Sequence, residues 1–141
     1  EVDILGLAEE VKAILEPSAM EKNVSVEVCG NGFSVLGVRR LLYEILYNLC
    51  DNAIKYNVPN GSVRILLEDR KLTVKDTGIG IPAKHQKRVF ERFYRVDKSH
   101  SKASGGTGLG LSIVKHAAAY HKAAMTLESV PGQGTAITIQ F

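Results

Sequence analysis

Two pairs of strand-like segments with very short links limit most strongly how this chain can fold. The segment "SVRILLE" (62–68) is followed after two residues by "KLTVKD" (71–76), and near the end "AMTLESV" and "TAITIQF" are separated only by "PGQG". Both pairs have the composition of strands, and so short a link joins antiparallel neighbours in a sheet. The sheet is therefore predicted to be mixed and mainly antiparallel.

Helical spacing of apolar residues fills most of the remaining chain. It predicts long helices at Asp3–Lys22, Val38–Tyr56 and Gly108–His121, with Pro17 disturbing the later part of the first. A shorter helix is expected around Lys84–Phe93, and further strands at Val24–Val28 and Phe33–Leu36. The predicted fold class is α+β: one domain, residues 1–141, built as a sandwich with about three helices on one face of the sheet.

Composition excludes several classes of protein. The chain has 141 residues, 45% of them hydrophobic and 23% charged, which suits a single soluble domain, and it contains no apolar run long enough to cross a membrane. It begins with Glu1 without a signal-peptide pattern, so we expect a piece of a longer protein. Cys29 and Cys50 are expected to be packed thiols in a reducing compartment, and the four histidines have neither metal spacing nor a serine partner.

A polar stripe interrupts the predicted helix at 38–56. Glu44, Asn48, Asn52 and Lys55 follow one another at steps of four, four and three residues, which keeps them on one helix face. Amide oxygens suit a Mg²⁺ ion that shares phosphate oxygens, and the lysine adds a positive charge for the same phosphates. The alternative is a plain surface face that carries two amides.

Strand alternation places Asp76 on the same side as Leu72 and Val74, at the edge of a buried surface. A carboxylate there needs a donor, and the exocyclic amine of adenine is one, whereas guanine presents a carbonyl at that position. Gly78 and Gly80 let the backbone approach a flat ring closely. The alternative is that Asp76 only caps the turn after its strand.

Three further segments carry weaker signals. "GGTGLGLS" (105–112) opens a helix with glycines, as anion sites do, but matches neither the Walker A loop nor the dinucleotide fingerprint. Residues 84–102 hold seven Lys or Arg and two acids, which favours a phosphate-bearing or acidic partner, or else forms a solvated face. Residues 98–107 have the composition of a mobile loop, and "RVFERFYR" beside it is either a docking surface or a cover over the core.

Taken in order, these pieces resemble the ATP-binding catalytic domain of sensor histidine kinases, of the superfamily that also holds gyrase and a heat-shock chaperone. "NLCDNAIKY" resembles the N box, "DTGIGI" the G1 box, "FERFYRVD" the F box and "GGTGLGLSIVKH" the G2 box, and "GQGTAITIQF" resembles the last element. The resemblance spans almost the whole chain and implies the Bergerat sandwich fold. The segment "HKAAM" departs from the pattern, because the glycine often found there is missing.

The resemblance implies a role for each matching position. The residues it assigns to ATP are Asn48, Asn52, Lys55, Tyr56, Asp76, Gly78, Gly80, Ile81, Gly106, Thr107, Gly108, Leu109, Gly110 and Leu111. Strand alternation in "TAITIQF" adds Thr135, which shares a face with Ile137, Ile139 and Phe141 and whose hydroxyl is expected to help line the pocket. Asn52 would be the Mg²⁺ ligand, and Asn48, Lys55 and Arg95 would act on the phosphates. Tyr56 would lie against the nucleoside, and the lid at 106–110 would close over the triphosphate.

The resemblance also implies the reaction. Hydrolysing relatives carry a glutamate base where Asn48 falls, and an amide cannot take a proton from water. The implied activity is transfer of the γ-phosphoryl group of Mg-ATP to a histidine on a separate dimerisation domain, with a response regulator downstream. The implied location is cytoplasmic, in a protein anchored at the cell membrane, and a fragment without the histidine is not expected to phosphorylate itself.

Two other functions remain open at this point. One is a serine kinase of the anti-sigma-factor type from the same superfamily, which the long aromatic F box disfavours. The other is a nucleotide-binding interaction module without transfer activity. Nucleic-acid binding is not expected, because the basic segment carries acids and glycines and no recognition helix is evident.

Overall fold

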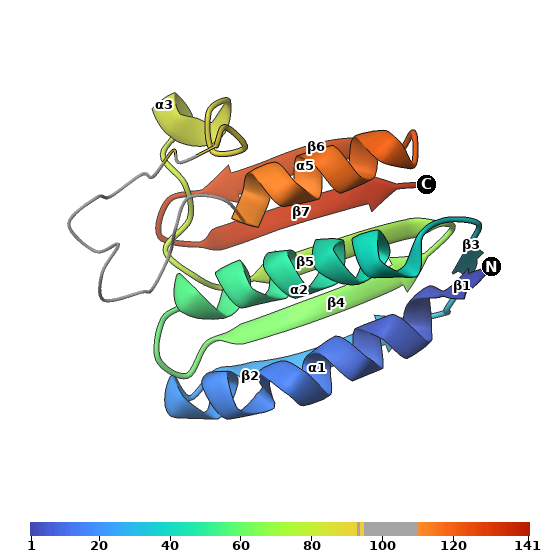
Figure 1. Ribbon diagram of the computed structural model, residues 1–141. Coiled ribbons are helices and arrows are strands. Elements are labelled where there is room, and N and C mark those ends of the chain that lie inside the picture. Colours follow the sequence, from blue (N-terminus) through green and yellow to red (C-terminus); the bar gives the residue numbers. More distant parts are fainter. Residues whose placement is uncertain (93, 95–109) are drawn as a thin grey trace.

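The computed structural model describes residues 1–92, 94 and 110–141, and it forms a helix layer packed on a sheet (Figure 1). The helices, in chain order, are α1 (Ile4–Glu21), α2 (Arg39–Lys55), α3 (Ala83–Gln86) and α5 (Gly110–Tyr120). The strands are β1 (Val2–Asp3), β2 (Ser25–Gly30), β3 (Ser34–Val35), β4 (Ser62–Glu68), β5 (Lys71–Asp76), β6 (Ala124–Val130) and β7 (Gly134–Gln140). The α+β prediction is confirmed.

The main sheet has five strands in the order β2-β4-β5-β7-β6. Only the pair β2–β4 is parallel, and the three other pairs are antiparallel. Two of them, β4–β5 and β6–β7, are the pairs that the short links predict. The long helices α1, α2 and α5 cover one face of this sheet (Figure 1). The strand predicted at Phe33–Leu36 is present as β3, but its antiparallel pairing with β1 was not predicted, because the two residues of β1 have no detectable period.

Helix α2 lies at the centre of the core, between α1 and α5. Its buried stripe is Leu42, Ile45, Leu46, Leu49, Cys50, Ala53 and Ile54. These side chains meet the inward row of β4 and β5, where Val63, Ile65, Leu67, Leu72 and Val74 are buried. Burial raises the pKa of the Cys50 thiol to about 12, in agreement with its predicted packing role. Both cysteines are free, but Cys29 is only half-buried and its Sγ donates to Glu27 Oε1, so the prediction of a packed thiol is wrong for Cys29.

The helix bounds differ from the prediction in two places. Helix α1 continues through Pro17, which is exposed, so the missing N–H costs no buried hydrogen bond. Helix α3 has only four residues, whereas the prediction extended it to Phe93. The prediction is wrong over the described residues that follow Gln86. Hydrogen bonds such as Arg88 N to His85 O close turns there instead.

The end of α5 explains how the chain manages without the expected glycine. The amide of Ala123 bonds to Ala118 O and that of Lys122 to Ala119 O, and Lys122 takes φ 56°. This left-handed position is the one that glycine usually fills at a helix C-terminus. The turn is therefore formed, with a lysine in a conformation that is strained for a residue with a side chain.

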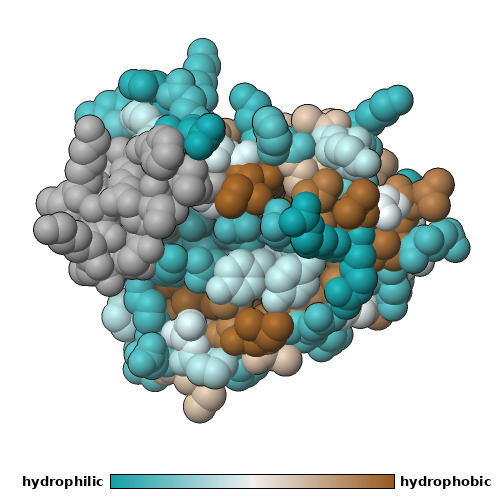
Figure 2. All heavy atoms as spheres, in the orientation of Figure 1, coloured by the Kyte–Doolittle hydropathy of each residue, from teal (hydrophilic) through white to brown (hydrophobic). Residues whose placement is uncertain are grey.

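Hydrophobic residues on the helix-covered face form separate patches with polar residues between them (Figure 2). The large exposed apolar side chains include Ile14 and Met20 of α1 and Leu36 before α2. Among the described residues, no helix combines the length and the apolar character that crossing a bilayer requires.

Candidate nucleotide site

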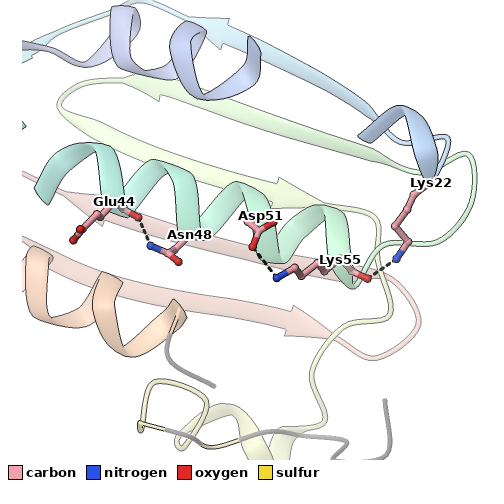
Figure 3. A network of polar contacts seen from close by, with 5 residues as sticks. All are labelled: Lys22, Glu44, Asn48, Asp51 and Lys55. Carbon is pink, nitrogen blue, oxygen red and sulfur yellow. Dashed lines mark hydrogen bonds and ion pairs between the residues drawn. The ribbon is translucent and has the colours of Figure 1, made fainter. Parts of the chain in front are cut away.

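The polar stripe lies on the side of α2 that faces the start of α5. Asn48 Nδ2 donates to Glu44 O at 2.8 Å, which anchors the amide and leaves Oδ1 directed away from its own helix (Figure 3). A Cβ added at Gly110 would lie 3.3 Å from Asn48 Oδ1 and 3.7 Å from both polar atoms of the Asn52 amide. The structure therefore brings the first residue of α5 against the two amides that the sequence singled out.

Lys55 is already paired in this structure. Its Nζ lies 3.0 Å from Asp51 Oδ2, one turn back on α2, and both side chains are largely shielded from solvent, with 29% and 21% exposed (Figure 3). The backbone oxygen of Lys55 accepts a hydrogen bond from Lys22, so the end of α1 holds the end of α2. Sequence reasoning missed Asp51, although its spacing from Lys55 is that of a helical ion pair.

Asp76, the last residue of β5, uses its two carboxylate oxygens differently. Oδ1 accepts backbone hydrogen bonds from Gly78 at 2.8 Å and Thr135 at 3.2 Å. Among the described residues Oδ2 accepts none. Burial raises the pKa of this carboxyl, and the two backbone bonds oppose that effect in part. Capping of the turn thus takes one oxygen and leaves the other as a half-buried acceptor.

The glycine turn after Asp76 passes between α2 and the β6–β7 hairpin. A Cβ on Gly78 would lie 2.4 Å from Tyr56 O, and one on Gly80, at φ +74°, would lie 2.4 Å from Val130 O. Ile79 N donates to Tyr56 O at 3.0 Å, which ties the turn to the end of α2. Tyr56 itself is 41% exposed, so its ring is available to a ligand.

Ser129, near the end of β6, was missed by sequence reasoning. Its Oγ accepts from Ile81 N at 2.7 Å and lies 2.8 Å from Thr135 Oγ1 and 2.9 Å from Gly134 O. Ser129 pairs with Thr135 in the β6–β7 register, and Thr135 pairs with Asp76 across β7 and β5. The sequence did contain a signal for Ser129: it is a polar residue on the inward-facing side of β6, in line with Met125 and Leu127.

The other predicted residues divide into two groups. Leu111 is half-buried and packs against the core from α5. Five predicted residues, Arg95, Gly106, Thr107, Gly108 and Leu109, lie outside the described residues, as does the expected loop at 98–107.

In the described part of the basic segment, Arg88 is already engaged by other residues of the chain. Arg88 bonds to Glu91 at 2.8 Å and lies over the Tyr94 ring, 4.5 Å from its centroid. Val89 is buried, and the half-buried Phe90 packs against the core. These two side chains act as a cover over the core, while Arg88 is already engaged.

The residues present fit a magnesium ion only as a partner of phosphate. No group of three or more His, Cys, Asp or Glu gathers anywhere in the part of the chain that the structure describes. A single amide oxygen from Asn52 suits an ion that keeps its waters and takes its other ligands from a triphosphate.

Comparison with protein families gives one match over most of the chain. Residues 37–141 match the family described as histidine kinase-, DNA gyrase B- and HSP90-like ATPases. The sensor-like histidine kinase SenX3 of Mycolicibacterium smegmatis is 43% identical over 146 residues, covering 99% of this chain and 38% of that protein. The sensor histidine kinase YkoH of Bacillus subtilis is 37% identical over 142 residues, covering 99% of this chain and 31% of that protein. The chain thus spans about a third of the length of these relatives.

Solved structures agree with the sequence relatives. The mycobacterial sensor histidine kinase MprB superposes with a TM-score of 0.81 at 32% identity, covering 98% of this chain and 94% of that one. Full-length ShkA, solved in complex with AMPPNP, gives a TM-score of 0.80 at 30% identity, covering 98% of this chain and 29% of that one. The fold is therefore the one found in the catalytic domains of sensor histidine kinases.

Proposed function

The chain belongs to the histidine kinase-, DNA gyrase B- and HSP90-like ATPase family, as a catalytic domain of the sensor histidine kinase kind, and on that premise we propose how it acts. It binds Mg-ATP in the site between α2, α5 and the ends of β5 and β7. It then donates the γ-phosphoryl group to a histidine on a separate dimerisation domain of the same kinase.

The observation that carries the proposal is that no donor from the described part of the chain bonds to Asp76 Oδ2. Two backbone donors hold Oδ1, so the carboxylate cannot rotate without losing both bonds. The fixed second oxygen is a half-buried acceptor, and such a group lowers its free energy by binding a donor. The exocyclic amine of adenine is that donor in the proposed complex, with Gly78 and Gly80 close to the ring and Tyr56 against the nucleoside.

The phosphates lie along the other half of the site in this proposal. The Asn48 and Asn52 amides face Gly110, at the start of α5, and a helix start favours negative charge. Asn52 would hold the Mg²⁺ ion, which would neutralise phosphate charge. Lys55 would reach the phosphates after leaving Asp51.

Asn48 gives the reason for transfer rather than hydrolysis. Its Nδ2 is committed to Glu44 O, and an amide oxygen has no useful basicity, so no base at this position activates water. In the proposed step a histidine ring nitrogen attacks the γ-phosphorus, the bond to the β–γ bridging oxygen breaks, and ADP leaves. The residues of this chain contribute by positioning and by charge.

The proposal extends to the rest of the protein. In this proposal the phosphoryl acceptor is a dimerisation domain of the same kinase, the parent protein is anchored at the cell membrane, and a response regulator acts downstream; the similarity to sensor histidine kinases supports this. Arg95 and the lid at 106–110 would complete the phosphate end.

Mixing this chain with a dimerisation domain that carries the acceptor histidine, in the presence of [γ-³²P]ATP, tests the function. We expect label on the added domain that is stable in base and lost in acid, as for a phosphorus–nitrogen bond, and no label with Asp76→Ala. Acid-stable label would indicate serine phosphorylation, and nucleotide binding without label on any partner would indicate an interaction module.

A further inference from the structure

The Ser129 hydroxyl contacts three polar groups on two other segments, the glycine turn after β5 and the start of β7. The Ile81 amide lies 2.7 Å away, Gly134 O 2.9 Å, and Thr135 Oγ1 2.8 Å. Ser129 thus connects the glycine turn after β5 to the start of β7, directly beside the residue that pairs with Asp76.

The number of protons decides the direction of these bonds. An amide N–H always donates, so Ser129 Oγ accepts from Ile81. Gly134 O can only accept, and it lies within hydrogen-bond distance of the Ser129 hydroxyl, so we assign the single Ser129 proton to it. Either hydroxyl could donate in the contact with Thr135, but with the Ser129 proton given to Gly134 O, all three contacts are satisfied when the Thr135 proton points at Ser129 Oγ.

We propose that Ser129 is a positioning residue that sets the base specificity of the site by directing the proton of the Thr135 hydroxyl. With that proton taken, Thr135 Oγ1 offers only lone pairs. Asp76 Oδ2, one strand away in register, also offers only lone pairs. This inference rests on the proposed nucleotide function.

Because Thr135 Oγ1 and Asp76 Oδ2 can then only accept hydrogen bonds, this side of the site discriminates between purines by their substituent at carbon 6. A 6-amino purine brings two N–H donors on one nitrogen, whereas the 6-oxo group brings lone pairs that face lone pairs, and the one donor of that edge, N1–H, lies on the neighbouring ring atom. A buried polar mismatch of this kind discriminates more strongly than a difference in shape. Loss of Ser129 would free the Thr135 proton to turn toward a 6-oxo group.

Calorimetric titration with ADP and IDP, which differ at this edge of the base, tests the inference. We expect wild-type protein to bind ADP more tightly than IDP. Ser129→Ala should lower the ratio of the IDP dissociation constant to the ADP dissociation constant about three- to tenfold, the scale of one hydrogen bond. In a Thr135→Val background the same change should leave the ratio unaltered, because no hydroxyl proton is then available.

Two further variants complete the design. Ser129→Cys leaves no cavity and offers only a weak hydrogen-bonding group, so it should change the ratio as alanine does, which keeps the test valid if Ser129→Ala does not fold. Thr126→Ala, on the same strand but exposed on the uncovered face, should leave both affinities unchanged.

The outcomes separate the inference from the proposed function. Weaker binding of ADP and IDP by the same factor in Ser129→Ala would mean a scaffolding role and overturn the inference. An equal fall of the ratio in the Thr135→Val background would also overturn it. Wild-type protein that binds neither nucleotide would reject the proposed function, and the inference with it.

Discussion

Asp76→Asn is the substitution for which the structure gives the most definite expectation. The Gly78 and Thr135 amides both donate to Oδ1, at 2.8 Å and 3.2 Å, so the amide oxygen of the new side chain must occupy that position. The NH₂ group then takes the place of Oδ2. An acceptor for the adenine amine becomes a donor that faces it, with almost no change in shape.

The loss of affinity follows from this inversion. A hydrogen bond to a charged group contributes about 1.5–3 kcal/mol, and the donor–donor contact adds an unsatisfied buried group. We expect a total of about 2–4 kcal/mol, which corresponds to a roughly thirtyfold to several-hundredfold weaker binding of Mg-ADP. IDP should lose much less, because its 6-oxo group can accept from the new amide.

The stability of the free domain should change in the opposite direction. Burial raises the pKa of Asp76 in the folded state, so the stability that this group contributes is present below its unfolded pKa and is lost as pH rises through the folded value. Asparagine has no charge to desolvate. We therefore expect the variant to be more stable than wild type at pH 7, with a difference that shrinks toward about pH 4.

Calorimetric titration and urea unfolding at the two pH values measure both effects, and Glu128→Gln, exposed on β6, serves as the control. ADP binding within threefold of wild type would refute the role of Oδ2. A variant that is less stable at pH 7 than at pH 4, relative to wild type, would refute the assignment of burial as the dominant influence on this carboxyl.

Three other substitutions test separate parts of the structure. Asn52→Ala should remove most of the Mg²⁺ dependence of ATP binding, and a titration that still responds fully to Mg²⁺ would exclude Asn52 as the ligand. Asp51→Asn should raise ATP affinity about two- to fivefold at low salt, because it frees Lys55 from its 3.0 Å ion pair. Loss of the pair should cost the free domain about 1 kcal/mol of stability or less. Unchanged ATP affinity would mean that Lys55 does not reach the phosphates. His121→Ala should lower the free energy of unfolding by about 1–2 kcal/mol, because the ring links two helices: Nε2 accepts from the Val38 amide at 3.1 Å and Nδ1 contacts Ala117 O at 2.8 Å. In the same urea-unfolding measurement, His116→Ala should have little effect, because His116 is exposed.

Local patterns predicted the long elements well. The bounds of α2 came within one residue at each end, because its apolar residues recur at helical spacing and Pro59 and Gly61 follow it. The β4–β5 hairpin was predicted at its observed bounds, because its link is too short for any other connection. In both cases the information lies within about twenty consecutive residues.

Contacts between distant segments were harder to predict. Asp76 was placed correctly at a buried edge, but the split use of its two oxygens depends on Thr135, 59 residues later. The role of Ser129 depends on the β6–β7 register and on the path of the glycine turn near Ile81. The short α3 could not be told from a longer helix, because the pattern does not show where turns replace it.

The residues that break local rules gather at one end of the fold. Asn48 and Asn52 are weak helix formers within α2, Asp76 is a half-buried carboxylate, and Gly80 has a positive φ. Asn48 and Asn52 face Gly110 at the start of α5, and Asp76 and Gly80 lie at and just after the end of β5. The start of α5 and the end of β5 are at the left of Figure 1, while the two termini lie at the opposite end. The apolar contacts that stabilise the domain are made elsewhere on α2 and the sheet. Stability and binding should therefore separate: substitutions that satisfy these polar groups within the protein should stabilise the free domain and weaken nucleotide binding together.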